Sequence, residues 1–376
     1  MLNGFIIEQI TANSKEENFI VWHSIEVNFV PLFSSTNILD NSQSIMTNLP
    51  LLFDNHGREM SYLRLAVTDR CNLRCTYCMP AEGIAYLPEK KLLSWEEMLR
   101  IVHVLNQLGI RKVRITGGEP FVRPGLMDFL QELAKIENLE ICLTTNGVLL
   151  ENHLDSLLNL GIKNVNLSLD SLDSERFFKI TRRNDFDQVY QNLMRMIEAN
   201  FKVKLNAVVM HGMNDNDILP LVKFTEKHPV SVRFIEEMPF NGSGLVEEKL
   251  FWDYRRILSH IKTEFPQIEE VPMAYGETSK NYHVPGFMGD VGIIAAFSRT
   301  FCGSCNRIRV TSLGQVKTCL YDDGVFDLKA YLRSGISDEE LREVLLGLYQ
   351  KRPLDGFEAE KNRKGVINES MTTIGG

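Results

Sequence analysis

Between Tyr62 and Ile235 the chain alternates short segments of strand character with longer segments of helical period. The pattern predicts strands at 62–68, 112–116, 139–143, 165–169, 202–209 and 230–235. The predicted helices span 94–109, 126–136, 151–159, 187–199 and 216–227. Units of this length imply parallel strands joined by right-handed crossovers. Roughly six such units predict an α/β fold, an incomplete (β/α)6-type version of the eight-unit TIM barrel.

Unusual polar motifs come directly after the predicted strands. Segment 117–120 follows the second strand, 144–147 the third and 236–239 the sixth. Barrels of this kind place their active sites at the carboxyl ends of the strands. We therefore expect these motifs to share one rim and one site.

The regular pattern does not extend over the whole chain. After about residue 244 the period becomes irregular and prolines and glycines are frequent, which predicts a smaller second module at 245–376 covering the open side of the barrel. The first module is expected at 52–244. Residues 1–51 form an extension with no assigned role, and Met46 or Met60 is an alternative start.

Composition limits the classes of ligand. The chain has 376 residues, 44% of them hydrophobic, and a net charge of −8. A negative charge argues against a general nucleic-acid binder, so a polyanionic ligand needs a local basic cluster. We see no signal peptide and no apolar run that could span a membrane, and we expect a reducing, cytoplasmic location.

Three thiols lie close together in the loop after the first predicted strand. They are Cys71, Cys75 and Cys78, spaced C-x3-C-x2-C. A [4Fe–4S] cluster normally takes four thiolates, so three leave one iron open for a substrate or cofactor. A zinc site with a distant fourth ligand, or ordinary loop cysteines, are the alternatives.

A second group of three thiols occurs in the C-terminal module. Cys302, Cys305 and Cys319 are spaced C-x2-C-x13-C, for which zinc is the commoner answer on spacing alone. No fourth cysteine follows, and no histidine occurs after His283, so a second cluster with an open iron fits the ligand count. The remaining Cys142 lies inside a predicted strand and is expected to be a buried core thiol.

The chain has no GxxxxGK[ST] phosphate-binding loop, so a triphosphate would be held by cationic side chains. Arg307 and Arg309 lie on one face of a predicted strand directly after Cys305. A guanidinium can bind phosphate with two hydrogen bonds. The alternative for this pair is a solvated strand face.

Several of these motifs together resemble a known family. Residues 64–70 lead into the first cysteines, Met79-Pro80 follows them, and Gly117-Gly118-Glu119-Pro120 is similar to a methionine-binding turn. From about Leu52 to its last residue the chain resembles the radical S-adenosylmethionine (SAM) superfamily, and within it the GTP 3′,8-cyclases of molybdenum-cofactor biosynthesis.

The resemblance implies a reaction and its cofactors. The first of two [4Fe–4S] clusters would reduce SAM to a 5′-deoxyadenosyl radical, which takes a hydrogen from C3′ of GTP. C3′ would then bond to C8, giving 3′,8-cyclo-7,8-dihydro-GTP. The implied partners are an electron donor, a second copy of the chain in a homodimer, and the cyclic pyranopterin monophosphate synthase that uses the product.

The resemblance also implies which residues bind each ligand. SAM would contact Tyr77, Gly118, Ser168 and Met238. The residues implied for GTP are Arg64, Arg114, Thr144, Lys204 and Arg233, in addition to Arg307 and Arg309. The open iron of the second cluster would bind guanine, and the terminal Gly375-Gly376 would enter the barrel.

Two other functions remain open at this point. Another twin-cluster radical SAM enzyme, such as a peptide maturase, shares the first motifs but typically has more auxiliary cysteines. A zinc-binding module without catalysis would leave the SAM-like motifs on the rim unexplained.

Overall fold

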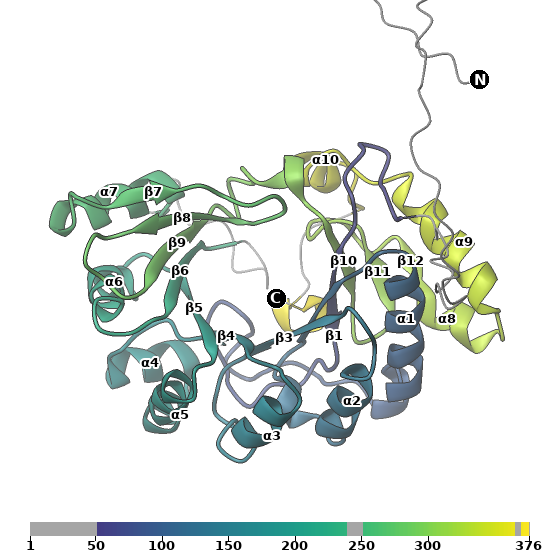
Figure 1. The fold of residues 1–376 in the computed structure, drawn as a ribbon, viewed down its shortest axis with the longest axis horizontal. Helices are drawn as coiled ribbons and strands as arrows, with labels where there is room; N and C mark the ends of the chain where they lie inside the picture. Colours follow the sequence, from purple (N-terminus) through teal and green to yellow (C-terminus); the bar gives the residue numbers. More distant parts are fainter. Residues whose placement is uncertain (1–50, 239–250, 365–369, 376) are drawn as a thin grey trace, which may run out of the picture. The chain divides into compact units, whose positions relative to one another are not determined.

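One sheet of twelve strands forms the centre of the structure, a computed structural model that describes residues 51–238, 251–364 and 370–375 (Figure 1). The strand order across the sheet is β12-β11-β10-β1-β2-β3-β4-β5-β6-β9-β8-β7. The expected extension up to residue 50, the module boundary at 244–245 and Gly376 lie outside the described residues.

The first six strands run parallel and are joined through helices, as the alternating pattern predicts. They are β1 (Tyr62–Ala66), β2 (Lys112–Thr116), β3 (Glu140–Thr145), β4 (Asn164–Ser168), β5 (Lys202–Val209) and β6 (Ser231–Glu236). The connecting helices lie on the outer side of these strands (Figure 1). They are α1 (Trp95–Gln107), α2 (Leu126–Leu133), α3 (Leu154–Asn159), α4 (Ser174–Thr181), α5 (Phe186–Glu198) and α6 (Ile218–Phe224).

Local signals account for where these helices begin. In α1 the Glu97 N–H donates to Ser94 Oγ at 3.2 Å, and the Ser94 N–H donates to the Glu97 carboxylate at 2.7 Å, which confirms the predicted start. The hydrophobic pattern does not predict α4, although Asp173 caps it by accepting from the Arg176 N–H at 2.9 Å. The helices α2, α3 and α6 are shorter than predicted, since helix ends often tighten into turns.

Strands from the later part of the chain extend both edges of the parallel sheet. At one edge, β10 pairs parallel with β1 and is followed by antiparallel β11 and β12. At the other, β9 pairs parallel with β6 and is followed by antiparallel β8 and β7. These strands are β7 (Glu269–Val271), β8 (Ser279–His283), β9 (Asp290–Ile294), β10 (Arg307–Val310), β11 (Gln315–Lys317) and β12 (Phe326–Asp327). The later helices are α7 (Tyr254–Glu264), α8 (Leu328–Arg333), α9 (Asp338–Tyr349), α10 (Gly356–Lys361) and α11 (Met371–Ile374).

The two faces of the sheet carry different residues, as β5 illustrates. Val203, Leu205 and Ala207 are buried in the hydrophobic core, whereas Lys204 and Asn206 line an inner cavity. This alternation follows from the two-residue period of a strand. The fold is thus α/β with a mostly parallel open sheet, whose outer face supplies the core and whose inner face supplies the site.

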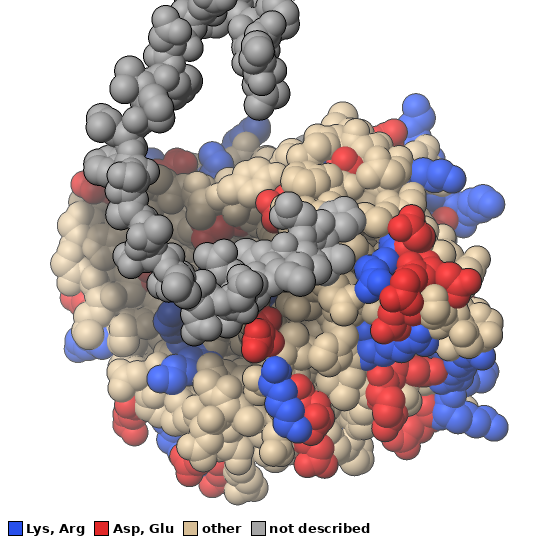
Figure 2. Space-filling view, turned by 45° about the vertical axis from the view of Figure 1, so that its right-hand side comes forward, with Lys and Arg blue, Asp and Glu red and all other residues tan. Residues whose placement is uncertain are grey.

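The outer surface differs from this inner face. Acidic and basic side chains are intermingled on the side of the molecule that Figure 2 shows. Among the residues that the structure describes, no helix is long and apolar enough to cross a membrane.

Candidate active site

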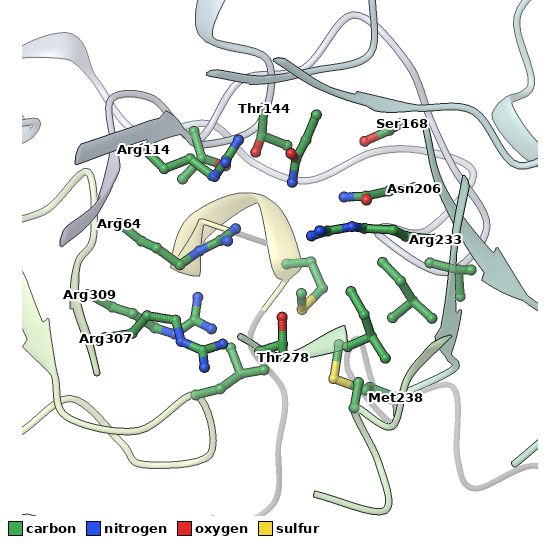
Figure 3. Close-up of a pocket in the computed structure, with 18 of the residues that line it drawn as sticks. Arg64, Arg114, Thr144, Ser168, Asn206, Arg233, Met238, Thr278, Arg307 and Arg309 are labelled. Carbon is green, nitrogen blue, oxygen red and sulfur yellow. The ribbon is translucent and has the colours of Figure 1, made fainter. Parts of the chain in front are cut away.

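A cavity of about 460 Å³ lies against the inner face of the sheet. Both cysteine groups line it, as do all the side chains that the sequence assigns to SAM and GTP within the described residues. Figure 3 shows labelled side chains from several strands pointing toward a common centre, among them Arg64, Arg114, Arg233 and Arg309. Residues as far as 310 positions apart in the sequence, Tyr62 and Thr372, line this one cavity.

The loop that carries the first cysteine group is fixed by the end of α4. The Arg74 N–H donates to the Thr181 carbonyl at 3.0 Å, and the Thr76 N–H donates to the Ile180 carbonyl at 2.9 Å. Arg182 Nη1 returns a hydrogen bond to the Arg74 carbonyl at 2.8 Å. The helix α4, which the sequence pattern did not predict, therefore holds in place the loop that carries Cys71, Cys75 and Cys78.

The first three thiols are free, half-buried and face the cavity. Burial and the nearby carboxylate of Glu119 raise the pKa of Cys71 to about 11. Burial and the neighbouring thiol of Cys78 raise the pKa of Cys75 well above its ordinary value. Thiolates at this position therefore need a positive counter-charge, which the iron of a bound cluster would supply.

The motif at 117–120 packs directly against this loop. The Gly118 N–H donates to the Thr68 carbonyl at 2.8 Å, and a Cβ at Gly118 would lie 2.1 Å from the Arg70 carbonyl oxygen. Glycine is therefore required here by the approach of the cysteine loop itself. The next residue, Glu119, is fully buried and accepts hydrogen bonds from Thr145 Oγ1 at 2.9 Å and the Asn146 N–H at 2.7 Å.

Two buried carboxylates lie near the first cysteine group, of which Asp170 lines the cavity and Glu119 does not. Burial raises the pKa of Glu119 to about 7 and the pKa of Asp170 to about 6, despite the hydrogen bonds that each accepts. Tyr77, which the sequence assigns to SAM, donates its hydroxyl to Asp170 Oδ2 at 2.9 Å. Ser168 ends β4 and Met238 follows β6, so both lie on the expected rim.

Cationic side chains gather at the other end of the cavity. The sheet register places Arg64 beside Arg114 on one side and beside Arg309 on the other. Burial and the neighbouring Arg309 lower the pKa of Arg64, and burial with Arg233 lowers the pKa of Lys204 to about 8. Such crowding of like charges stores repulsion that a bound polyanion would relieve.

The second cysteine group borders this cationic end. Cys302 begins the short 3₁₀ helix Cys302–Ser304, Cys305 ends it, and Cys319 follows β11. Arg307 lies two residues after Cys305 at the start of β10, as the sequence indicates. The leftover Cys142 is buried in β3, as predicted.

In the described parts of the chain no three His, Cys, Asp or Glu side chains come together as ligands of a single metal ion. A zinc ion holds thiolates at about 2.3 Å. A [4Fe–4S] cluster is wider than an ion, so its thiolates need not converge in that way.

The end of the chain reaches between the two ends of the cavity. Gly375 follows α11 with φ +73°, and its carbonyl accepts hydrogen bonds from Arg64 Nη2 at 3.2 Å and from Arg309 Nη1 at 3.3 Å. At the start of α11, Ser370 Oγ donates to the carbonyl of Cys78 at 2.8 Å. The structure thus places Gly375 beside these two cavity arginines, while Gly376 is outside the described residues.

Sequence reasoning missed two asparagines that point into the site. Asn166 and Asn206 line the cavity, and their buried Oδ1 atoms have no hydrogen-bond partner among the described residues. Thr144 Oγ1 and Arg233 Nε share this property. Buried polar atoms are rarely left unpaired, so these four atoms mark where a ligand would bind. The sequence feature that could have identified Asn166 and Asn206 is the alternation of polar and apolar residues in β4 and β5.

Two family models match the chain in succession. The radical SAM superfamily model matches residues 65–225, and the Molybdenum Cofactor Synthesis C model matches residues 230–357. A GTP 3′,8-cyclase of Clostridium perfringens is 40% identical over 331 residues, which cover 86% of this chain and 99% of that protein.

Longer relatives match as well. Molybdenum cofactor biosynthesis protein 1 of Drosophila melanogaster is 39% identical over 321 residues, covering 85% of this chain and 57% of the fly protein. The human protein of the same name is 40% identical over 296 residues, covering 78% of this chain and 46% of its own length. This chain therefore spans about half the length of these relatives.

A solved structure shares the fold. Streptococcus suis SuiB superposes with a TM-score of 0.53 at 17% identity, covering 82% of this chain and 70% of that chain. A sequence identity of 17% supports a shared fold and nothing further. The match to the bacterial cyclase is stronger, since it covers 99% of that protein at 40% identity. The chain thus belongs to the radical SAM superfamily and, within it, to the family of the GTP 3′,8-cyclases.

Proposed function

We propose that this chain is an enzyme, a GTP 3′,8-cyclase that catalyses the first step of molybdenum cofactor biosynthesis. The observation that carries the proposal is one cavity lined by two cysteine groups, the buried carboxylate of Asp170 and a set of cationic side chains. Each ligand that the reaction needs has side chains of the complementary kind in this cavity.

The acidic end is the proposed site of the first cluster and SAM. Cys71, Cys75 and Cys78 would hold three irons, and their loop is already fixed by α4. Asp170 would offset the positive charge of SAM, with Tyr77, Gly118, Ser168 and Met238 around it. This assignment is supported by the position of Asp170 in the cavity wall, where burial raises the pKa of its carboxyl to about 6.

The cationic end is the proposed site of GTP and the second cluster. The triphosphate would lie among Arg64, Arg114, Arg233, Arg307, Arg309 and Lys204, with Thr144 nearby. Cys302, Cys305 and Cys319 would hold the second cluster, whose open iron would face the guanine. The support is that guanidiniums and thiols border the same part of the cavity.

When bound, the first cluster and SAM supply a 5′-deoxyadenosyl radical that takes the C3′ hydrogen of GTP. C3′ then bonds to C8, and one further electron and a proton, from an external donor, complete 3′,8-cyclo-7,8-dihydro-GTP, an isomer of GTP. The chain's own residues orient the ribose, with Asn166, Asn206 and Thr144 offering the unpaired polar atoms on that side.

The finer architecture and the partners belong to the same proposal. Residues 52–244 would be an incomplete (β/α)6 barrel and 245–376 the module covering its open side, which the pairing of β10 and β9 with its edge strands supports. The free thiols favour a reducing compartment, and we propose the cytoplasm. A homodimer and a downstream cyclic pyranopterin monophosphate synthase complete the proposal.

An anaerobic assay with deuterium at C3′ of GTP tests this function. The protein, SAM, labelled GTP and dithionite should yield 5′-deoxyadenosine carrying one deuterium, together with a cyclised product that has the mass of unlabelled GTP, because a proton replaces the deuterium that was lost. Unlabelled 5′-deoxyadenosine with unchanged GTP would contradict the cyclase, and a colourless zinc protein without SAM cleavage would contradict the superfamily chemistry.

A further inference from the structure

A buried network of charged side chains lies behind the second cysteine group. Asp54, Arg58 and Arg352 are 4%, 5% and 4% exposed. Arg58 Nε donates to Asp54 Oδ2 at 2.6 Å, and Arg352 Nη1 donates to the same oxygen at 3.2 Å. One carboxylate thus serves two guanidiniums and leaves one positive charge in excess. Because a buried charge is costly unless it is paired, this excess calls for a further anion.

The two guanidiniums hold all three segments that bear the second thiols. Arg58 Nη1 donates to the Cys302 carbonyl at 2.9 Å. Arg352 Nη1 donates to the Cys305 carbonyl at 2.7 Å, and Arg352 Nε donates to the carbonyl of Thr318, the residue before Cys319, at 2.8 Å. The spacing of the cysteine-bearing segments is therefore set from behind by one rigid network.

One of these contacts reaches a sulfur atom. Arg352 Nη2 donates to Cys305 Sγ at 3.0 Å. The first cysteine group differs, since its Cys71 Sγ accepts a longer contact, 3.7 Å, from the neutral Asn146 amide. If Cys305 is a thiolate ligand, its negative sulfur balances the excess positive charge of the Asp54–Arg58–Arg352 network.

We propose that Arg352, anchored by Asp54, is a positioning residue of the second iron–sulfur cluster that fixes the Cys305 ligand and raises the reduction potential of that cluster. The inference rests on the two-cluster part of the proposed function. Reduction adds negative charge to a cluster, and a cationic hydrogen-bond donor at a ligand sulfur stabilises the reduced form more than the oxidised one. Removing the donor should therefore make the cluster harder to reduce.

The test uses full-length protein that holds the second cluster alone. Changing Cys71, Cys75 and Cys78 together to Ala removes the first cluster, and the anaerobic protein is then titrated with reductant while the electron paramagnetic resonance signal is followed. Arg352→Gln should lower the midpoint potential, and Arg352→Lys, which keeps the charge but loses the fork, should lower it less. The control is Arg123→Gln, because the buried Arg123 guanidinium donates to the Val67 and Leu93 carbonyls and contacts the Met98 sulfur, and so belongs to another part of the fold than the second cysteine group.

Each outcome decides the inference. An unchanged midpoint in both Arg352 variants, or an equal shift in Arg123→Gln, would overturn it. Loss of iron in Arg352→Gln with retention in Arg352→Lys would support it. If both variants lose iron, Asp54→Asn leaves the guanidinium present but unanchored: a lowered midpoint supports the inference and an unchanged one overturns it. If the variant with Cys71, Cys75 and Cys78 changed to Ala holds no iron even with Arg352 intact, the two-cluster part of the proposed function is refuted.

Discussion

The two ends of the cavity differ in the sign of the charge that is buried there. At one end, burial raises the pKa of Asp170 to about 6, so negative charge is disfavoured there without a cation. At the other end, burial and Arg233 lower the pKa of Lys204 to about 8, so positive charge is disfavoured without an anion. A cavity with such opposed ends is suited to one positively charged and one strongly negative ligand, held side by side.

The tail lies where the two ends meet. Its helix α11 contacts the first cysteine loop through Ser370 and the cationic end through the Gly375 carbonyl. A carbonyl is a weak acceptor for two guanidiniums compared with a phosphate. The tail can therefore order the arginines without competing strongly with a triphosphate.

The largest effect should come from the first thiols. Cys75→Ala should abolish 5′-deoxyadenosine formation, because the cluster would lose one of three thiolates. GTP binding should survive, since the cationic end is built from other strands. Mass spectrometry and equilibrium binding measure the two separately. Cys142→Ala is the control, and normal SAM cleavage by Cys75→Ala would refute the assignment of this end.

The next largest effect should come from the tail. Deleting Gly375-Gly376 should leave iron content and fold intact, because neither cysteine group lies in the tail, while GTP cyclisation drops steeply. In Gly375→Ala the residue would keep φ near +73° at a cost of about 1–2 kcal/mol, and its Cβ would lie 2.9 Å from Thr116 Cγ2. Product yield per iron is the measurement.

A control variant in the same helix tests whether the loss of activity is specific to the terminal glycines. Thr373→Ala alters the same helix at a side chain whose hydroxyl donates to the Ser370 carbonyl within the helix itself. It should retain most activity. Full activity in the truncated protein would show that the double glycine is an ordinary chain end.

The sequence predicted the parts of this site that depend on order along the chain. Strands β1 to β6 and the two cysteine groups could be located because strand period and thiol spacing are local properties. Arg352 could not, since it lies 47 residues after Cys305 and meets that residue only in the folded chain. The helix α4 was also missed, because Phe177 and Ile180 give a short apolar face and its cap is a single aspartate.

Arginines at the cationic end should give an intermediate effect. Arg307→Ala or Arg309→Ala should weaken GTP binding by about 1.5–3 kcal/mol, the range for hydrogen bonds to charged groups, which is roughly ten- to hundredfold in Kd. SAM cleavage should persist. Arg111→Ala removes an exposed guanidinium that donates to the Asn106 and Ile110 carbonyls at the end of α1, and it should change neither property. If GTP affinity is unaltered in both variants, Arg307 and Arg309 do not bind GTP and belong to a solvated strand face.

The smallest effect, and the finest test of the opposed ends, is the pH dependence set by Lys204. Its pKa of about 8 lies below the ordinary 10.5, so the empty protein loses this charge as pH rises through 8. GTP affinity should then fall by about 1.5 kcal/mol between pH 7 and 9.5. Stability of the empty protein should change in the opposite sense, because between pH 8 and 10.5 the unfolded chain binds more protons at this site than the folded one. Calorimetry in two buffers should detect proton uptake on GTP binding, and Lys204→Arg should abolish the uptake and flatten the affinity profile. A wild-type profile as flat as that of Lys204→Arg would place Lys204 away from the bound anion.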